Sequence, residues 1–452
     1  MRVAPYMAVF ETFAPDTPLQ LSEVLSDFKL VIREQVAYQG RAIVHGMVST
    51  GVSTLYEVTL GEFWLDVDLL TLTNVTGGGE RGFNSFLQEW QKMYKVLPEY
   101  KVAVADIQTF LADLRSWLDQ VELATSASLK LRNSPGQEIQ FLKELGASTT
   151  PAIDALFDRF EEVAAKIDPD LQVAHSVFGK RQLHQLILCS PFMYRTFHKP
   201  LGYAGDYEMV NMIVGEPLQG NSLFAKIVNL WFLQQPPAIA HRNRIAYLQG
   251  KLQEETGRAS VHGERAKIFN LGCGPAAEIQ GFLAENSLCN KSHFTLVDFN
   301  EETLLHTAAA LDGIKDTRHR STEIEFQKKS VVQLLKESER SSRSLSPEVF
   351  DLVYCAGMFD YLSDELCRRL LEALYRAVAP GGLLIATNVD KCNPRRRTMD
   401  YLMEWFLLYR DRKQLGALAP ACVARENLCV KSDETGVNVY LEIRKPELHA
   451  AN

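Results

Sequence analysis

The chain has 452 residues, of which 46% are hydrophobic and 23% are charged, a composition typical of globular proteins. That length predicts roughly two to four domains, each large enough to bury its own core. The formal net charge of −8 argues against a nucleic-acid binder, because such proteins usually carry a strongly basic face.

Membrane, secretion and metal signals are also missing from the sequence. No stretch approaches the ~20 consecutive apolar residues that span a bilayer, and the first residues lack the basic start and apolar run of a signal peptide. The cysteines form no C-x-x-C pair and join no histidine cluster, so we expect no disulfide framework and no metal site. Free, scattered cysteines fit a reducing compartment, and we expect a cytoplasmic protein.

Residues 1–83 show the pattern of a small β domain. Three runs are rich in β-branched or aromatic residues, and glycines separate them. The predicted strands are Ala42–Val44, Leu55–Leu60 and Phe63–Asp68.

Residues 84–250 have a helical period instead. Apolar residues recur at spacings of three and four between Ile107 and Val121, the stripe of an amphipathic helix. Further helices are predicted at Pro151–Ile167, Arg181–Leu188, Leu223–Leu233 and, after the break at Pro236-Pro237, Ala238–Gln253. We interpret these stripes as helix packing.

Residues 251–452 alternate strand and helix, which predicts a parallel sheet with helices on both faces. The expected strands are Ile268–Leu271, Phe294–Val297, Ile324–Phe326, Phe350–Tyr354, Leu383–Ala386 and Val437–Ile443. The expected helices are Ala276–Leu283, Glu301–Leu311 and Asp364–Val378. The chain is thus expected to be multidomain, with α+β and α/β parts.

A glycine-rich turn, Asn270-Leu-Gly-Cys-Gly-Pro-Ala276, follows the first of these strands and opens a helix. Gly272 and Gly274 permit a tight turn and let a ligand approach the main chain. A G-x-G turn alone is also compatible with a nicotinamide dehydrogenase. Asp298 ends the next strand, where a carboxylate can accept both hydroxyls of a ribose.

The turn, Asp298 and the Pro380-Gly-Gly382 join before the fifth strand together resemble the class I S-adenosylmethionine-dependent methyltransferases, which have a Rossmann-like sheet. The resemblance implies a cofactor site that several segments share. Its residues would be Asn270, Gly272, Cys273, Gly274, Asp298, Phe299, Ser330, Val331, Ala356 and Met358. Asp351, at the start of the fourth strand, is either part of this site or a strand-edge carboxylate.

A second block, Lys199-Pro-Leu-Gly-Tyr-Ala-Gly-Asp-Tyr-Glu-Met209, combines polar side chains with two glycines, as in a loop that closes over a ligand. This block resembles the lead-in to the bacterial methyltransferases that make 3-hydroxypalmitic acid methyl ester, an extracellular quorum-sensing factor. Two later segments, His241-Arg-Asn-Arg244 and Asn393–Arg410, also resemble that family. The resemblance implies that the helical region acts as an active-site lid and that Tyr203 and Asp206 contribute to the site.

The amino-terminal region resembles a PilZ-type barrel, a fold that often binds cyclic di-GMP. Asn74–Gly79 is similar to one PilZ motif, but the arginine arm is missing near Arg33, which argues against cyclic di-GMP binding. The expected domains are therefore a PilZ-like barrel (1–83), a helical region and lid (84–250) and a methyltransferase domain (251–452). The sequence is compatible with a homodimer and does not determine the oligomeric state.

The methyl acceptor decides which side chains are needed. A carboxylate acceptor is already ionised at pH 7 and needs cations or donors to orient it, whereas a hydroxyl or amine needs a base, for which His241 is the preferred candidate. Candidate catalytic residues are Tyr203, His241 and Arg244, with Arg195, Lys199 and Arg242 as further cations. Trp231, Phe232, Trp405, Phe406 and Leu407 would line an acyl channel or belong to the core. The favoured acceptor is a hydroxy-fatty acid. The alternatives are another metabolite, a protein, or a module that binds the cofactor for signalling without catalysis.

Overall fold

The structure, a computed structural model, describes residues 2–4, 7–13, 19–32, 35–49, 53–61, 95–127, 135–261, 263–341 and 349–447. The chain divides into two compact units that are interleaved in sequence. Unit 1 consists of Met1–Ala204, Glu216–Gln235 and Pro394–Phe406, and unit 2 of Gly205–Gly215, Pro236–Asn393 and Leu407–Asn452. This division does not follow the three expected segments, because two stretches of the expected helical region pack with the carboxy-terminal sheet.

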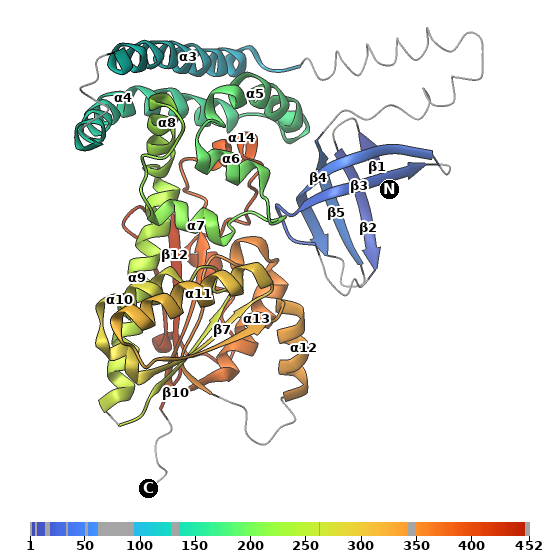
Figure 1. The fold of residues 1–452 in the computed structure, drawn as a ribbon. Helices are drawn as coiled ribbons and strands as arrows, with labels where there is room; N and C mark the ends of the chain where they lie inside the picture. Colours follow the sequence, from blue (N-terminus) through green and yellow to red (C-terminus); the bar gives the residue numbers. More distant parts are fainter. Residues whose placement is uncertain are drawn as a thin grey trace. The chain divides into compact units, whose positions relative to one another are not determined.

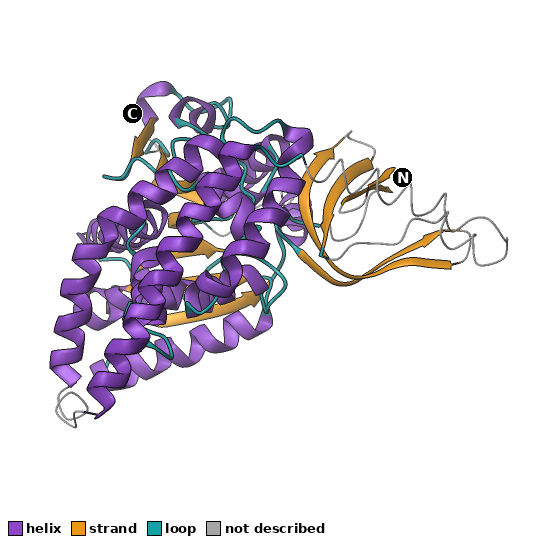
Figure 2. Cartoon of the chain, turned by 90° about the horizontal axis from the view of Figure 1, so that it is seen from above, coloured by secondary structure: helices purple, strands orange, loops and turns teal. Residues whose placement is uncertain are grey.

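The amino-terminal part of unit 1 is an antiparallel sheet, and up to Gly61 the described residues form no helix (Figure 2). Its strands are β1 (Arg2–Ala4), β2 (Met7–Phe13), β3 (Val24–Ile32), β4 (Gln35–Ser49) and β5 (Ser53–Leu60). Their order is β1-β2-β5-β4-β3, so among the described residues β1 and β3 are free edges and the expected closed barrel is not formed. The register shifts once between Val44 and Gly46, where β4 pairs with β5. The expected strand Phe63–Asp68 and motif Asn74–Gly79 lie outside the described residues.

Helices make up the rest of unit 1 (Figure 1). They are α3 (Pro98–Ala127), α4 (Pro135–Ala164), η2 (Pro169–Leu171), α5 (Gln172–Ile187), α6 (Pro191–His198), α8 (Leu223–Leu233) and α14 (Arg396–Leu402). The expectation that a helix begins at Pro151 is wrong, because Pro151 lies inside α4. Pro151 has no N–H to donate to the carbonyl four residues earlier, and the helix nevertheless continues through it, with Ile153 and Phe157 buried on its far side.

A mixed seven-stranded sheet forms the centre of unit 2, in the order β11-β12-β10-β9-β6-β7-β8. Its strands are β6 (Ala266–Leu271), β7 (Ser292–Asp298), β8 (Glu323–Lys328), β9 (Phe350–Cys355), β10 (Val378–Val389), β11 (Leu428–Ser432) and β12 (Asn438–Arg444). Strands β6 to β10 pair in parallel, as expected, but β12 is antiparallel to both of its neighbours. The sheet is therefore mixed, and β11 was not expected from the sequence.

Helices cover this sheet (Figure 1). The helical elements of unit 2 are α7 (Tyr207–Val214), α9 (Pro236–Val261), α10 (Ala277–Glu285), η3 (Ser287–Lys291), α11 (Glu301–Arg318), α12 (Val331–Ser341), η4 (Phe359–Tyr361), α13 (Asp364–Ala377), α15 (Arg412–Gly416) and η5 (Arg425–Asn427). No described helix is both long and apolar enough to cross a membrane.

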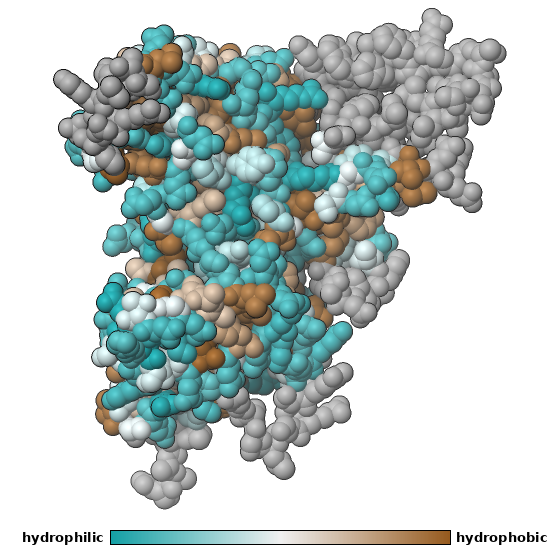
Figure 3. Space-filling model, in the orientation of Figure 1, coloured by the Kyte–Doolittle hydropathy of each residue, from teal (hydrophilic) through white to brown (hydrophobic). Residues whose placement is uncertain are grey.

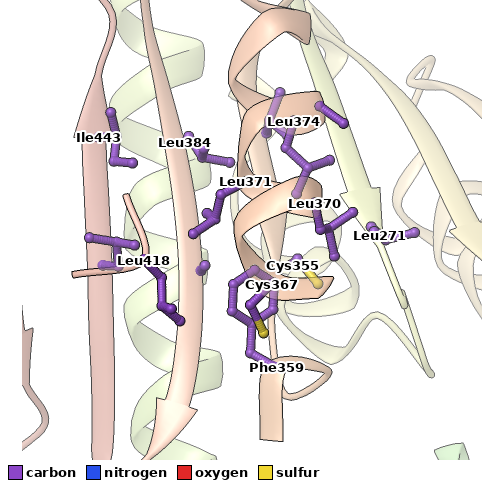
Figure 4. Packing of buried hydrophobic residues seen from close by; sticks show 14 of the residues in the cluster. Leu271, Cys355, Phe359, Cys367, Leu370, Leu371, Leu374, Leu384, Leu418 and Ile443 are labelled. Carbon is purple, nitrogen blue, oxygen red and sulfur yellow. The ribbon is translucent and has the colours of Figure 1, made fainter. Parts of the chain in front are cut away.

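Burial of apolar side chains fixes this arrangement. On one face of the sheet, Leu370, Leu371 and Leu374 of α13 pack against Leu384 of β10 and Ile443 of β12 (Figure 4). The leucines are at most 2% exposed. Each buried leucine contributes about 1.5–3 kcal/mol, so this cluster fixes α13 and with it the carboxyl end of β9 just before it.

Candidate active site

The strand order of unit 2 places a crevice at the carboxyl end of β6. The chain leaves β6 toward β7 and β8, and then returns to β9 on the other side of β6. In open α/β sheets, ligands bind outside the carboxyl ends of the strands where the order reverses in this way. The residues that follow Leu271 and Cys355 therefore line the candidate site.

The glycine turn after β6 is bound to the neighbouring strand. The amides of Gly272 and Cys273 donate to the Val297 carbonyl at 2.8 and 3.1 Å. Gly272 has a φ of +71° and Gly274 a φ of +52°, conformations that glycine adopts without strain. A Cβ on Gly272 would lie 2.7 Å from Cε of Met358, so no larger residue fits there without displacing that side chain.

Asp298 ends β7 beside this turn and is 6% exposed. Its Oδ2 accepts the amide of Gly274 at 3.2 Å, and its Oδ1 accepts the amide of Asn300 at 3.0 Å. Burial raises the pKa of Asp298, and the amides of Asn300, Gly274 and Phe299 partly offset that rise. The carboxylate is thus held in place while retaining lone pairs for the hydroxyls of a ligand.

Met358 and Gly357 follow β9 and form the other side of the crevice. Gly357 has a φ of +85°, and its amide donates to the Thr387 hydroxyl of β10 at 3.0 Å. A Cβ on Gly357 would lie 3.0 Å from Nη1 of Arg244. The guanidinium of Arg244, on α9, therefore packs directly on the main chain that follows β9. The two segments are far apart in the sequence, so the sequence did not predict this contact.

Arg244 and His241 are one turn apart on α9 and contact each other. Arg244 Nη2 donates to Nε2 of His241 at 3.0 Å, and no carboxylate among the described residues lies within ion-pair distance of Arg244. Burial, together with the charges of Arg244 and Arg242, lowers the pKa of His241 well below its usual 6.5. The imidazole is therefore neutral and weakly basic, while Arg244 is a cation available to an anionic ligand.

Asp360 is a carboxyl group near the crevice that sequence reasoning missed. It lies in η4 and is 4% exposed, and its Oδ1 accepts the amide of Val389 at 2.6 Å. Burial raises the pKa of Asp360 to about 6, although the Val389 amide, Arg244 and Arg410 lower it. An acidic residue five positions after a β-strand carries no distinctive signal, so only the packing identifies this group.

Asn270 lies beneath the turn with its side chain directed to other protein groups. Its amide donates to Glu278 Oε1 at 3.2 Å, and the hydroxyl of Tyr354 donates to the same oxygen at 2.7 Å. Burial raises the pKa of both Glu278 and Tyr354. This closed network supports the strand from which the glycine turn departs.

The remaining expected cofactor residues of the sheet lie at the carboxyl ends of β7 to β9. Phe299 follows Asp298 and is 39% exposed. Ser330 precedes α12, and its hydroxyl accepts the amide of Gln333 at 3.3 Å, while Val331 is buried. Ala356 is half-buried beside Gly357. Asp351 lies at the opposite, amino end of β9, where Arg258 and the amide of Lys267 contact it, and it is a strand-edge carboxylate.

The structure divides the Lys199–Met209 block between the two units. Tyr203 is half-buried in the turn after α6 in unit 1. Asp206 belongs to unit 2, where its side chain accepts the amide of Met209 at 2.8 Å and caps α7. Lys199 is 3% exposed and donates to the Met403 carbonyl at 3.0 Å, so it is engaged within unit 1.

Glu404 is a buried anion of unit 1 with three cations around it. It is 3% exposed, and Lys180 and Arg41 both form ion pairs with its carboxylate, the latter at 2.9 Å. Burial alone would raise the pKa of Glu404, but Lys180, Arg41 and Lys199 lower it to about 2. Burial lowers the pKa of Lys199 to about 7. Lys199 belongs to the Lys199–Met209 block and Glu404 to the Asn393–Arg410 segment, so two of the segments that resemble the ester-forming methyltransferases contact each other in unit 1.

The aromatic residues considered for an acyl channel separate into two groups. Trp231 and Phe232 are 2% and 5% exposed, and Trp231 packs on Phe157 with ring centroids 4.4 Å apart. They are core residues of unit 1. Trp405 and Phe406 are half-buried.

Residues 269–384, from β6 to β10, match a family model described as a methyltransferase domain. These residues form a methyltransferase domain. Its cofactor is S-adenosylmethionine. The glycine turn, Asp298 and the residues after β9 all lie inside the matched range, and they fit this cofactor because the turn leaves the main chain open and Asp298 offers acceptors for a ribose.

Similarity over the whole chain adds little to this match. No curated protein matches the sequence. A possible exported protein from Bordetella parapertussis is 14% identical, with 67% of this chain and 97% of that one covered and a TM-score of 0.40. Magnesium protoporphyrin IX methyltransferase from Synechocystis PCC 6803, with bound S-adenosylhomocysteine, is 11% identical over 56% and 98% of the two chains, with a TM-score of 0.36. The N-methyltransferase NodS from Bradyrhizobium japonicum WM9 is 15% identical over 53% and 98%, with a TM-score of 0.31. These values are too low to indicate an acceptor for this chain.

Proposed function

We propose that the chain transfers a methyl group from S-adenosylmethionine to the carboxylate of a hydroxy-fatty acid, which gives a methyl ester. When bound, the cofactor supplies a methyl group on a positively charged sulfonium. The proposed cofactor residues are those of the sheet edge, with Gly272 to Gly274 beside the methionine and ribose, Asp298 on the ribose hydroxyls, and Phe299 with Val331 beside the adenine. The quorum-sensing role of such esters is part of the same proposal.

The observation that carries the carboxylate acceptor is the state of the Arg244–His241 pair. His241 is too weakly basic to remove a proton from a hydroxyl at neutral pH, because burial and two arginines lower its pKa. A carboxylate needs no base, since its oxygen is already anionic. Arg244 has the planar fork of donors that binds a carboxylate, and neutral His241 keeps that fork in one orientation.

In this mechanism the chain positions the reacting atoms and removes water, and no proton is transferred. The bound cofactor would supply the methyl group to the carboxylate oxygen and would leave as a neutral thioether, and Arg244 would hold that oxygen until its charge is lost in the ester. Arg244 orients the oxygen. Holding the two reactants in line supplies much of the rate acceleration.

A second acceptor class is favoured by Asp360. Its pKa of about 6 is suited to a general base at neutral pH, so a hydroxyl or amine acceptor would use Asp360 rather than His241. Methylation of another metabolite or a protein, or cofactor binding without catalysis, are the remaining alternatives.

Mass spectrometry distinguishes these functions. Purified protein is incubated with methyl-labelled S-adenosylmethionine and a panel of 3-hydroxy fatty acids, and products are tested for cleavage by mild alkali, which hydrolyses esters but not ethers. We expect a labelled, alkali-sensitive product with wild type and Asp360→Asn, and loss of it in Arg244→Met. An alkali-stable product that requires Asp360 would refute the ester and would support a hydroxyl or amine acceptor instead. Cofactor binding without any labelled lipid would refute both lipid reactions.

A further inference from the structure

Helix α7 is separated in sequence from the rest of unit 2, to which it belongs. The chain enters it through Gly205, whose φ of +78° is readily adopted only by glycine, and Asp206 then caps its first turn. It leaves at Gly215, where the helix ends. The glycine and aspartate of the Gly-Tyr-Ala-Gly-Asp block thus build a sharp entry to this helix.

Two residues of α7 bind α11 near its start. The Tyr207 hydroxyl donates to Glu302 Oε1 at 2.9 Å, and its ring stacks on His306 with centroids 4.3 Å apart. The Asn211 amide nitrogen lies 3.2 Å from Nε2 of His306. We call Tyr207, Asn211, Glu302 and His306 the latch. Figure 1 shows α7 beside α11 in unit 2.

The other end of α7 contacts α9. Nη1 of Arg242 donates to the carbonyl of Ile213 at 3.0 Å. The helix therefore spans from α11 to α9, and these are the two helices that flank the candidate site. The Thr307 hydroxyl of α11 donates to the Gly274 carbonyl of the glycine turn at 2.7 Å, and Arg244 of α9 packs on Gly357.

We propose that α7 is the gate of the cofactor site and that the latch holds it closed. This inference rests on the proposed function, because the ligand behind the gate is S-adenosylmethionine or its product. Met209, Val210 and Ile213 are buried and keep α7 seated by their apolar side chains. The Tyr207–Glu302 hydrogen bond is exposed to water, so it is the contact that opens most readily.

The surface near the latch is consistent with ligand passage. Figure 3 shows hydrophobic side chains gathered over α11 on an otherwise hydrophilic face of unit 2. On α11, Leu305 is 67% exposed, and Phe299 before the helix is 39% exposed. Opening α7 would uncover the first turns of α11, which follow directly on Asp298.

Stopped-flow binding of S-adenosylhomocysteine to the full chain tests the gate, with Glu302→Ala as the variant and Glu301→Ala as its matched control. Both changes remove one carboxylate from the first turn of α11, but Glu301 pairs with Lys328 of β8 instead of α7. Loss of one hydrogen bond should raise the opening rate, so in Glu302→Ala the association and dissociation rate constants both rise roughly two- to tenfold while their ratio stays near wild type. Glu301→Ala should leave both unchanged.

Tyr207→Phe removes the same hydrogen bond from the other side and guards against misfolding of one variant. Wild-type rate constants in both Glu302→Ala and Tyr207→Phe would overturn the gate. A faster dissociation alone, with association unchanged, would also overturn it, because that result assigns α7 a direct contact with the ligand. If wild type itself does not bind S-adenosylhomocysteine, the proposed function fails instead.

Discussion

Asp298 is the residue on which the proposed cofactor site most depends. Its two oxygens are fixed by main-chain amides of the glycine turn and of the helix start, so its position is set before any ligand arrives. Asp351 is a useful contrast, because it belongs to the same sheet but lies at the amino end of β9 with Arg258. An aspartate at the carboxyl end of a strand faces the proposed cofactor site, whereas one at the amino end pairs with an arginine away from that site.

Asp298→Asn should weaken S-adenosylmethionine binding about 10- to 100-fold, because hydrogen bonds to a charged acceptor contribute about 1.5–3 kcal/mol. Isothermal titration calorimetry measures this, and Asp351→Asn should bind as wild type does. Binding by wild type should also weaken in acid as the carboxylate protonates, at a pH above that of an ordinary aspartate because the pKa of Asp298 is raised. Equal losses in both variants would contradict the assignment.

Glu404 supplies a second prediction at this scale. Removing its charge leaves the buried Lys199 and the partly buried Lys180 and Arg41 without their anion, so Glu404→Gln should lower the free energy of unfolding of unit 1 by about 3–5 kcal/mol at pH 7. The folded-state pKa of about 2 lies below the ordinary 4.5, so this stabilisation is present above pH 4.5 and is lost as the pH falls through 2. Urea unfolding at pH 7 and pH 3 should therefore show a smaller difference between the two proteins in acid.

Arg395 is one of the side chains that fix helix α14 to its unit, together with Glu161, which accepts the amides of Arg397 and Thr398. Arg395, just before it, is 6% exposed and donates to Gln235 at 2.7 Å, with ion pairs to Asp158 at 2.5 Å and Asp154 at 3.3 Å. Its guanidinium also lies over the ring of Trp231. One planar cation thus contacts side chains of both α4 and α8 from the segment that follows β10.

Arg395→Lys should loosen this attachment, because an ammonium group cannot reproduce the fork of donors. Since Asp154 and Asp158 are partly exposed, we expect a modest loss of about 1–2 kcal/mol in the unfolding free energy of unit 1. Amide hydrogen exchange in α14 should accelerate, while β6 and β7 keep wild-type protection. Arg425→Lys, in the short helix η5, is the control and should change neither quantity.

At the scale of the whole molecule, the chain builds two units that exchange segments. Segments of the helical region, Gly205–Gly215 and Pro236–Val261, join the sheet of unit 2, and Pro394–Phe406 joins unit 1. Each unit nevertheless has its own buried cluster, one around the sheet of β6 to β12 and another on β2 to β5. Because the two buried clusters are separate, we expect a ligand bound to one unit to stabilise mainly that unit.

S-adenosylmethionine should therefore protect the amides of β6, β7, β9 and α7 from hydrogen exchange far more than those of β2, β4 and β5. At a free concentration of 100 times the dissociation constant, binding stabilises its unit by about 2.7 kcal/mol, which slows exchange through unfolding of that unit roughly 100-fold. Mass spectrometry of peptides reads both regions in one experiment. Equal protection of both sheets would show that the two units unfold together.

The sequence by itself determined what depends on neighbouring residues. Glycines with a carboxylate after the next strand, alternation of strands and helices, and the proline pair before Ala238 are local patterns. The structure has the turn and the strands β6 to β10 where they were expected, and α9 begins at Pro236, two residues before its expected start. The methyltransferase model matches the stretch from β6 to β10. The start of helix α4 was misjudged because Pro151 signals a start locally, whereas the apolar side chains on both sides of it are buried in one continuous helix.

Only the tertiary structure decided which distant groups meet and how that changes their chemistry. It places Arg244 against Gly357, makes His241 a weak base, and reveals Asp360, because burial and nearby charge arise from contacts between segments far apart in sequence. It also leaves the amino-terminal sheet open among the described residues, where the expected barrel required closure by strand pairing. Strand pairing, burial and pKa depend on the folded environment, which local periodicity does not encode.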